Sequence, residues 1–443
     1  MEGKRSINLG FRGWMLVIYQ FIAFMMYTAI NNYPLNILAD LYGGATLISR
    51  IYTICTILGI IIQLIISSWI GRMKSIKRFG SVLGLISLIM LLGIMLIPSS
   101  HSGLWLVAYG AGVLFGIMYA TFALSILVGQ WFPTRKGTVM GIATIAFPIA
   151  NGLLGPFATR VFSKGYPDVF GAYLPFFIVF VIGWVIGLVF IKDYPEQCGA
   201  YRDNDKNMTP EIAQAMMEEE IENKKTTVWR IGATLKCPDF WCITIPMGAL
   251  LMFSVGMMTQ TSAIIGQFEG QLDFVGGYTG IMLLICIFGC IGSYILGLLD
   301  TRLGTRKAVA ISVCIMIVAG ILGIIPNAIA LLISMICLAL FMGASSNFTV
   351  SAAAQYWRRE DFSSIFAVIN PVANVLCALG PTVIAMLLYS SFGYQSIFVV
   401  TLVIGIISLI LTMLFKPSRI KTRDDKYRTA AGKPLDDALE GRK

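Results

Sequence analysis

The side chains best suited to chemistry in this sequence are amides and hydroxyls inside long apolar stretches. Tyr27 and Asn31 are four residues apart, as are Asn370 and Asn374, so each pair would share one face of a helix. A polar group inside an apolar helix is costly unless it is hydrogen-bonded or faces a wet cavity. We therefore predict a binding site for a small solute. Its candidate residues are Tyr27, Asn31, Tyr119, Asn151, Gln260, Asn347, Asn370 and Asn374.

For any one of these residues, the alternative is an ordinary hydrogen bond between helices, worth about 0.6 kcal/mol. Catalysis is not expected, because the sequence has one histidine and its apolar runs hold no carboxylate by our count. No Gly-x-x-x-x-Gly-Lys phosphate loop occurs, which argues against an ATP-driven pump. We expect no enzyme, cofactor or metal ion, and no proton relay through a buried acid.

The composition predicts a membrane protein. Apolar residues make up 57% of the 443 residues and charged ones 13%, so a water-soluble fold would lack the polar surface to cover itself. A spanning helix needs about 20 uncharged, mostly apolar residues. Six runs free of charged residues have that length, namely 13–39, 51–71, 137–159, 169–191, 240–268 and 274–299.

Three further runs are about twice as long, and each has a turn signal near its middle. The runs are 79–134, 308–357 and 362–415, and the signals lie at residues 98–103, 326–327 and 389–393. The sequence thus predicts an all-α integral membrane protein with twelve transmembrane helices. Barrel strands would instead show short alternating segments.

The positive charge of the chain predicts its orientation. With the N-terminus inside, the inner segments hold 30 of the 33 basic residues, and the outer loops hold only Arg50, Arg160 and Lys164. We expect a multi-pass protein of the plasma (inner) membrane with both termini cytoplasmic. The net charge of +10 follows from this topology and does not indicate nucleic acid as a partner. We expect the partners of the protein to be the lipid bilayer and a small-molecule solute.

The polar stretch 192–239 divides the predicted helices into two sets of six. We expect a half at 1–191, a cytoplasmic linker at 192–239, a second half at 240–415 and a basic tail at 416–443. Thr209, Pro210 and Glu211 predict the start of a short linker helix that runs through Glu222.

The two halves resemble each other in sequence. Gln130 and the Gly155-Pro156 pair recur 225 residues later as Gln355 and Gly380-Pro381. A duplication explains this offset of half the chain, and it predicts two pseudo-symmetric halves with a cleft between them. We expect the two Gly-Pro pairs to weaken their helices where the halves move.

Residues 297–307 (GLLDTRLGTRK) resemble the signature loop of the major facilitator superfamily, with a glycine turn, an acid and several bases. Asp300 stands one place before the usual position of the acid, and the equivalent loop 68–78 keeps only bases. The resemblance implies the major facilitator fold, with helices 1, 4, 7 and 10 around a central cavity. It also implies secondary transport by alternating access. We expect an inner latch of ion pairs from Arg72, Lys74, Asp300, Arg302, Arg306 and Lys307, with solvated loop charges as the alternative.

Residues 131–142 and 193–199 are similar to the oxalate/formate antiporter and monocarboxylate transporter group. This narrower resemblance implies a monocarboxylate or related organic anion as the solute, and exchange as one mode of transport. Ser293 and the pair Asn370 and Asn374 stand where oxalate carriers place cations, so oxalate itself is not expected. Two alternatives stay open, namely a carrier or exporter of a neutral or hydrophobic compound and a channel or non-transporting receptor. We expect a monomer.

Overall fold

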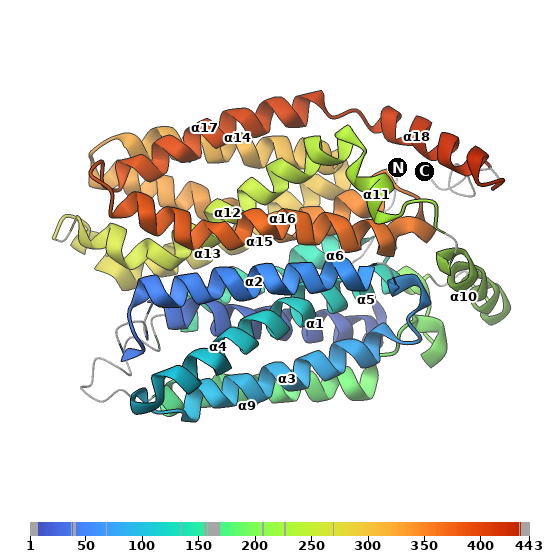
Figure 1. Ribbon diagram of the computed structural model, residues 1–443, viewed down its shortest axis with the longest axis horizontal. Helices are drawn as coiled ribbons and strands as arrows, with labels where there is room; N and C mark the ends of the chain where they lie inside the picture. The colour runs from blue at the N-terminus through green and yellow to red at the C-terminus, as the bar shows by residue number, and fades with distance from the viewer. Residues whose placement is uncertain are drawn as a thin grey trace.

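The computed structural model is built from helices that run side by side in two groups (Figure 1). It describes residues 8–36, 38, 41–67, 69–133, 135–154, 157, 169–205, 208–225, 227–268, 270–433 and 435. One group holds the spans before residue 195, and the other holds the spans after residue 235. They are called the N-terminal and the C-terminal half below.

The N-terminal half contains five long spans and one broken span. Four of the long spans are single helices, namely α1 (Gly10–Asn36), α2 (Ala45–Ser67), α3 (Ile76–Leu96) and α9 (Val169–Phe190). The fourth span in chain order joins α4 (Ser102–Gly116), the π-helix η4 (Ile117–Ala123) and α5 (Leu124–Trp131). The broken fifth span consists of α6 (Lys136–Ala143), α7 (Ala146–Ile149) and the π-helix η5 (Ala150–Leu154).

The C-terminal half contains six long helices. They are α12 (Pro238–Gly266), α13 (Gly277–Leu303), α14 (Thr305–Ile324), α15 (Ala328–Tyr356), α16 (Phe362–Leu388) and α17 (Gln395–Leu414). The three turn signals are confirmed, because the helices end at Leu96, Ile324 and Leu388 and the next ones begin within seven residues. Eleven helices in the described chain are long and apolar enough to cross a membrane, and the broken fifth span supplies the twelfth predicted crossing up to Leu154.

Two expectations about charge placement are wrong. Arg50 lies in the second turn of α2 with its side chain exposed, not in a loop, because α2 begins at Ala45, before the charge-free run. A long arginine side chain can extend from a helix end toward water. Asp300 lies in the last turn of α13 and is buried, not in a loop between helices, because α13 continues to Leu303.

The structure describes only one of the two Gly-Pro pairs that were predicted to weaken their helices. Pro381 lies inside α16, which continues unbroken to Leu388, and Gly380 allows α16 to approach Gly256 of α12. Gly155 and Pro156 lie outside the described residues, as do Arg160 and Lys164.

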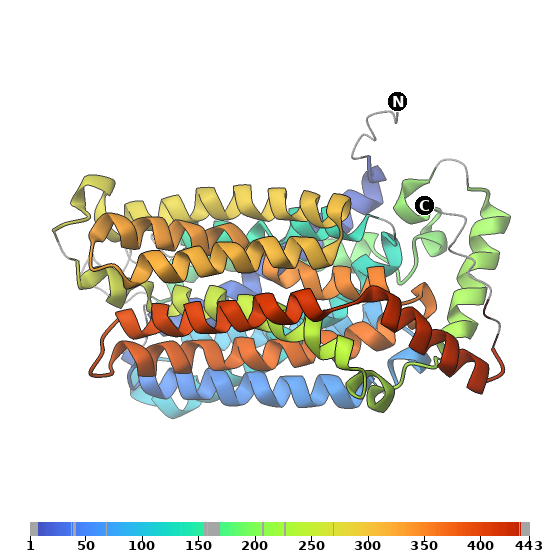
Figure 2. The same cartoon turned by 90° about the horizontal axis from the view of Figure 1, so that it is seen from above.

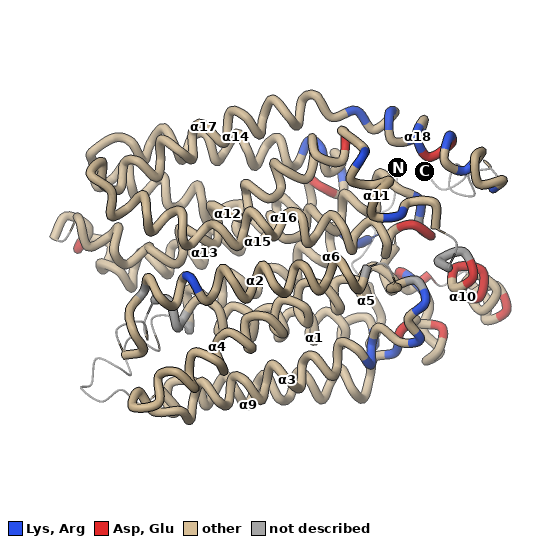
Figure 3. The backbone as a smooth tube through the Cα atoms, viewed as in Figure 1, with Lys and Arg blue, Asp and Glu red and all other residues tan. Residues whose placement is uncertain are grey.

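The linker and the tail lie at one end of the bundle, where most lysines and arginines also lie (Figures 2 and 3). The linker forms η6 (Pro195–Cys198), η7 (Arg202–Asn204), α10 (Pro210–Lys225) and α11 (Ile231–Leu235). The predicted start of α10 at Pro210 is confirmed, and the helix extends three residues beyond Glu222. The tail forms α18 (Pro417–Ala430). We call this end of the molecule the basic end and the opposite end the far end.

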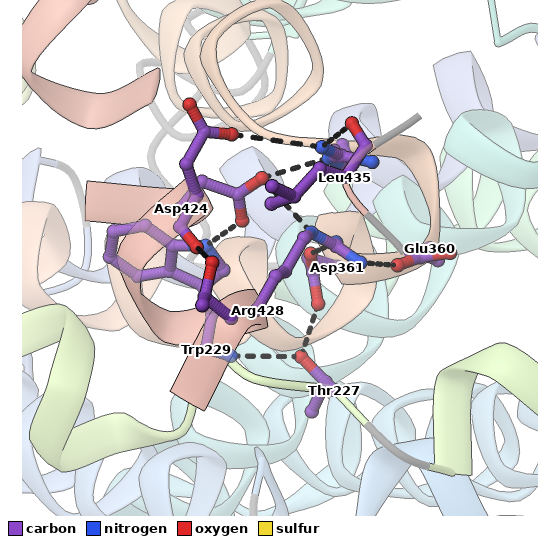
Figure 4. Close-up of polar contacts among 10 residues, drawn as sticks. Thr227, Trp229, Glu360, Asp361, Asp424, Arg428 and Leu435 are labelled. Carbon is purple, nitrogen blue, oxygen red and sulfur yellow. Dashed lines mark hydrogen bonds and ion pairs between the residues drawn. The ribbon is translucent and has the colours of Figure 1, made fainter. Parts of the chain in front are cut away.

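A buried ionic cluster fastens the tail and the linker to the C-terminal half (Figure 4). Arg428 of α18 donates to Asp361 at 2.7 Å and to Asp424 at 3.0 Å, and its Nη1 lies 2.5 Å from Glu360. From the linker, Thr227 donates to Asp361 at 2.5 Å and the Trp229 indole to Asp424 at 2.8 Å. Burial raises the pKa of Asp361 to about 6, against the opposing effects of Thr227 and Arg428.

Replacing Arg428 with alanine should lower stability by about 3–5 kcal/mol, because Asp361 would stay buried without its cation and Asp424 would keep only Arg358. A lower midpoint of thermal unfolding in detergent would measure this loss. Lys426→Ala, on an exposed part of the same helix, is the matched control and should leave the midpoint nearly unchanged. Equal midpoints for the two variants would contradict a stabilising role for the cluster.

Candidate solute site between the two halves

A cavity lies between the halves near the middle of the bundle. It is bounded by α1, α2, η4, α7 and η5 on one side and by α12, α15 and α16 on the other. Its lining residues are Tyr27, Thr28, Asn31, Asn32, Tyr52, Thr121, Phe147, Asn151, Leu251, Ser254, Val255, Met258, Met342, Ser346, Asn374 and Cys377. Every one of these side chains is uncharged, and eleven carry a hydroxyl, amide or thiol group.

Asparagine amides join the walls of the cavity. Asn32 of α1 donates to the Asn151 side-chain oxygen at 2.9 Å, and Asn151 in turn donates to the Met342 sulfur at 3.6 Å. Asn151 belongs to the N-terminal half and Met342 to α15 of the C-terminal half. A contact chain therefore crosses from one half to the other through the wall of the cavity.

Asn31 differs from its neighbour because its amide group has no hydrogen-bond partner in the described part of the molecule. The side chain is only 2% exposed and lines the cavity, as does the Tyr52 side chain, whose hydroxyl also has no partner within hydrogen-bond distance. The Tyr27 hydroxyl is the polar group nearest to both. Leaving such groups unpaired in a closed interior costs about 1–3 kcal/mol each. Unpaired donors and acceptors that face a cavity are the groups that a bound solute would satisfy.

A smaller hollow of about 260 Å³ extends the site along α16. Asn374 lines both spaces and donates to the Asn370 carbonyl at 2.8 Å and to its side-chain oxygen at 3.1 Å. Asn370 donates to the Thr121 carbonyl in η4 at 3.5 Å. The same π-helix accepts a hydrogen bond from Gln20 of α1 at the Ala120 carbonyl, at 2.9 Å. The wide turn of η4 thus gives carbonyl oxygens to amides from both halves.

The structure brings five of the eight predicted solute-binding residues to these two spaces, namely Tyr27, Asn31, Asn151, Asn370 and Asn374. Tyr119 lies elsewhere, beside Tyr19 and against Gly84. Asn347 donates to the Gly137 carbonyl at 3.1 Å, toward the basic end. Gln260 is buried in α12 but lines neither space.

Sequence reasoning missed several lining residues of the large cavity. They are Thr28, Asn32, Tyr52, Thr121, Ser254, Ser346 and Cys377. Asn32 follows Asn31 and Ser346 precedes Asn347, so each lay next to a chosen residue. Helical spacing of the kind that linked Tyr27 to Asn31 also links Thr28 to Asn32 and Cys377 to Asn374, and it could have found them.

The halves contact each other on both sides of the cavity. Toward the far end, the Thr53 hydroxyl of α2 lies 2.9 Å from that of Thr382 in α16. Toward the basic end, the hydroxyls of Thr138 and Thr301 are 3.2 Å apart, and the Lys136 ammonium lies 3.5 Å from the centre of the Phe362 ring. The described residues of the two halves therefore touch on both sides of the cavity.

Glycines allow the halves to approach closely. Gly141 of α6 packs against the backbone of Gly297 in α13, and a Cβ added at Gly152 would come within 2.2 Å of Cys286. We call this contact of the fifth span with α13 the seam. Side chains larger than hydrogen at these positions would hold the seam apart.

Of the six predicted latch residues, the structure brings only Asp300 to the seam, next to Gly137. Arg72, Lys74, Arg302 and Lys307 have exposed side chains. Arg306 donates to the carbonyls of Thr412 and Met413 within its own half, at 3.1 and 2.9 Å. No ion pair between any two of the six occurs in this conformation of the described chain.

Two comparisons with known proteins bear on this arrangement. A family model described as Major Facilitator Superfamily matches residues 15–325 and 281–440. The crystal structure of the human organic anion transporter MFSD10 (TETRAN) covers 90% of this chain and 97% of that chain, with a TM-score of 0.64 and 12% sequence identity. At this identity the likeness shows the fold alone. No curated protein matches the sequence significantly, so the narrower resemblance to oxalate/formate and monocarboxylate carriers stays a prediction.

Asn31→Leu should raise the midpoint of thermal unfolding or leave it unchanged, because it removes an unpaired buried amide with little change in volume. Solute should no longer protect the variant against heat if Asn31 binds it. Gln63→Leu is the matched control, since Gln63 is also a buried amide without a described partner but lies outside the cavity lining. A marked drop in stability specific to Asn31→Leu would show that the amide has a structural partner instead.

Proposed function

The chain belongs to the Major Facilitator Superfamily and is a secondary transporter, and we propose that its solute is a small monocarboxylate or related organic anion. The observation that carries this proposal is the closed cavity at the meeting of the two halves, lined by hydrogen-bonding side chains. Rocking of the halves around that cavity would expose it to each side of the membrane in turn. The unpaired amide of Asn31 and the hydroxyl of Tyr52 would bind the solute's carboxylate.

A second candidate is a neutral solute, and the uncharged lining favours it. A carboxylate held without a cation in a closed site would depend entirely on donors such as Asn31 and Tyr52. A neutral compound, or a monocarboxylic acid that enters in its protonated form, would avoid this cost. A hydrophobic compound would leave the amides unpaired and is supported less well.

The orientation and location remain part of the proposal. Lysines and arginines gather at the basic end, and cytoplasmic loops of membrane proteins retain such residues (Figure 3). The basic end would therefore face the cytoplasm of a cell bounded by the plasma (inner) membrane. The protein would work as a monomer, since one chain already encloses the cavity.

Transport into liposomes would separate the two candidates. Purified protein in liposomes loaded with unlabelled lactate or formate should exchange it for the labelled compound, with saturation and counterflow. Uptake of labelled glycerol alone would favour the neutral candidate, and uptake without saturation would contradict a carrier. The Asn31→Leu variant should lose at least about tenfold in exchange rate, the effect of 1.4 kcal/mol of lost binding.

Alternating access predicts that fastening the far end stops transport. Thr53→Cys combined with Thr382→Cys should form a disulfide under oxidation, because the two hydroxyls are 2.9 Å apart across the halves. Exchange should stop in the oxidised double variant and return after reduction, and each single variant under the same oxidant is the control. Unchanged exchange in the fully cross-linked protein would exclude opening at the far end.

A further inference from the structure

Asp300 differs from the other buried acids of the chain because it has no cation beside it. The described part of the chain buries the side chains of six acidic residues, and one of them, Glu196, pairs with Arg202. Glu220 pairs with Arg202, Asp239 with Arg419, and both Asp361 and Asp424 with Arg428. Asp300 forms no ion pair with any described residue.

The Asp300 carboxyl is 4% exposed, and only one of its oxygens is hydrogen-bonded. Oδ1 accepts from the Thr305 hydroxyl at 2.6 Å, and the Ser351 hydroxyl is a second polar neighbour of the carboxyl. Oδ2 has no partner within hydrogen-bond distance among the described atoms. The carboxyl lines a pocket of about 510 Å³ at the basic end, together with Lys136, Thr301, Ser351 and Gln355. A pocket of this size has room for water, which can deliver or remove a proton.

The titratable or charged groups on the elements around Asp300 are engaged elsewhere or, like Lys307 of α14, exposed. Lys136 of α6 lies over the Phe362 ring, at 3.5 Å. The Arg306 guanidinium of α14 donates to carbonyls at the end of α17, and the Tyr356 hydroxyl of α15 accepts from the Arg306 amide at 2.7 Å. On α13 itself, Arg302 is exposed. No backbone amide at the start of α6 donates to Oδ2 either.

The carboxyl also lies on the surface that must part when the basic end opens. Its Oδ2 is 2.9 Å from the position of a Cβ built on Gly137, which belongs to the other half. The neighbouring hydroxyls of Thr138 and Thr301 meet at 3.2 Å across the same contact. Opening would therefore move Asp300 from a largely buried position beside a pocket into open water.

We propose that Asp300 binds a proton when the basic end closes and releases it when that end opens. A carboxylate buried without a cation is costly, whereas the neutral acid is not, so closure favours proton uptake from the water at the basic end. On opening, the O–H bond breaks and the proton passes to water, leaving the hydrated carboxylate. This inference rests on the proposed alternating access. It adds that the pH of the solution at the basic end regulates the opening of that end.

Thermodynamic linkage between proton binding and closure gives the direction in which pH shifts the balance between the closed and the open form. A proton that binds the closed form more tightly stabilises that form, so acid on the basic side should favour closure and alkali should favour opening. An ionised Asp300 held by the positive end of α6 would produce the opposite dependence. The direction of the pH effect therefore decides between a proton site and a fixed charge.

The test is disulfide formation between Thr138→Cys and Thr301→Cys, which requires a closed basic end. Proteolysis in the linker, near α10, would separate the halves unless the disulfide joins them, so a gel measures the linked fraction. Every rate is divided by that of the same cysteine pair carrying Asp300→Asn at the same pH, which removes the pH dependence of thiol oxidation. No solute is needed, so this result is independent of the liposome assay.

The relative cross-linking rate should fall by about threefold or more between about pH 5.5 and about pH 8.5. Asp300→Glu should keep a pH dependence, because it restores a carboxyl group. Asp239→Asn, which neutralises a buried acid that has a cation, should leave the dependence unchanged. A flat ratio, or one that rises with pH, would overturn the proposal even if exchange in liposomes succeeds.

If exchange in liposomes fails but cross-linking shows the expected pH dependence, the proposed solute is rejected and proton binding at Asp300 is still supported.

Infrared difference spectra provide a second readout of proton binding. Acidification of the detergent-solubilised protein should produce a protonated-carboxyl band that Asp300→Asn lacks, and an identical band in that variant would contradict proton binding at this residue.

Discussion

The high cost of placing a charge in a low-dielectric interior organises this molecule. The spans exclude charge except near their ends, and the buried acids at the basic end are held by arginines such as Arg428. The central cavity obeys the same rule, because its lining is polar but uncharged. A solute bound in this cavity would depend on amides and hydroxyls, and the proton site that we propose at Asp300 lies instead in the pocket at the basic end.

The two ends of the bundle are closed by different means. Toward the far end, α2 and α16 meet through the hydroxyls of Thr53 and Thr382. At the basic end, the fifth span meets α13 through glycines, the Asn347 amide and the Lys136 ammonium. Neither closure contains an ion pair across the halves in the described chain, so both can break without leaving an unpaired charge.

Much of the architecture could be predicted from the sequence, because spans and turns are local signals. Charge-free runs and the signals at residues 98–103, 326–327 and 389–393 located the helices to within a few residues. Tyr27 and Asn31 were found from helical spacing alone. Tyr119 was misplaced because periodicity does not say which neighbour a face meets. The break in the fifth span has a local signal, because Pro148 cannot donate to the Thr144 carbonyl four residues earlier. The burial of Asp300 depends on contacts with the other half, which no single helix encodes.

The π-helix η4 fixes the rotational phase of the fourth span. Its wide turns carry one more residue than an α-helix of the same length would, and they expose the carbonyls that Gln20 and Asn370 reach. Deleting one residue between Ile117 and Ala123 would restore regular winding and rotate everything from Leu124 to Trp131 by about 100°. Gly129, which receives the Phe362 ring from the other half, would then face elsewhere. The number of residues in this segment, as much as their identity, is therefore under structural constraint.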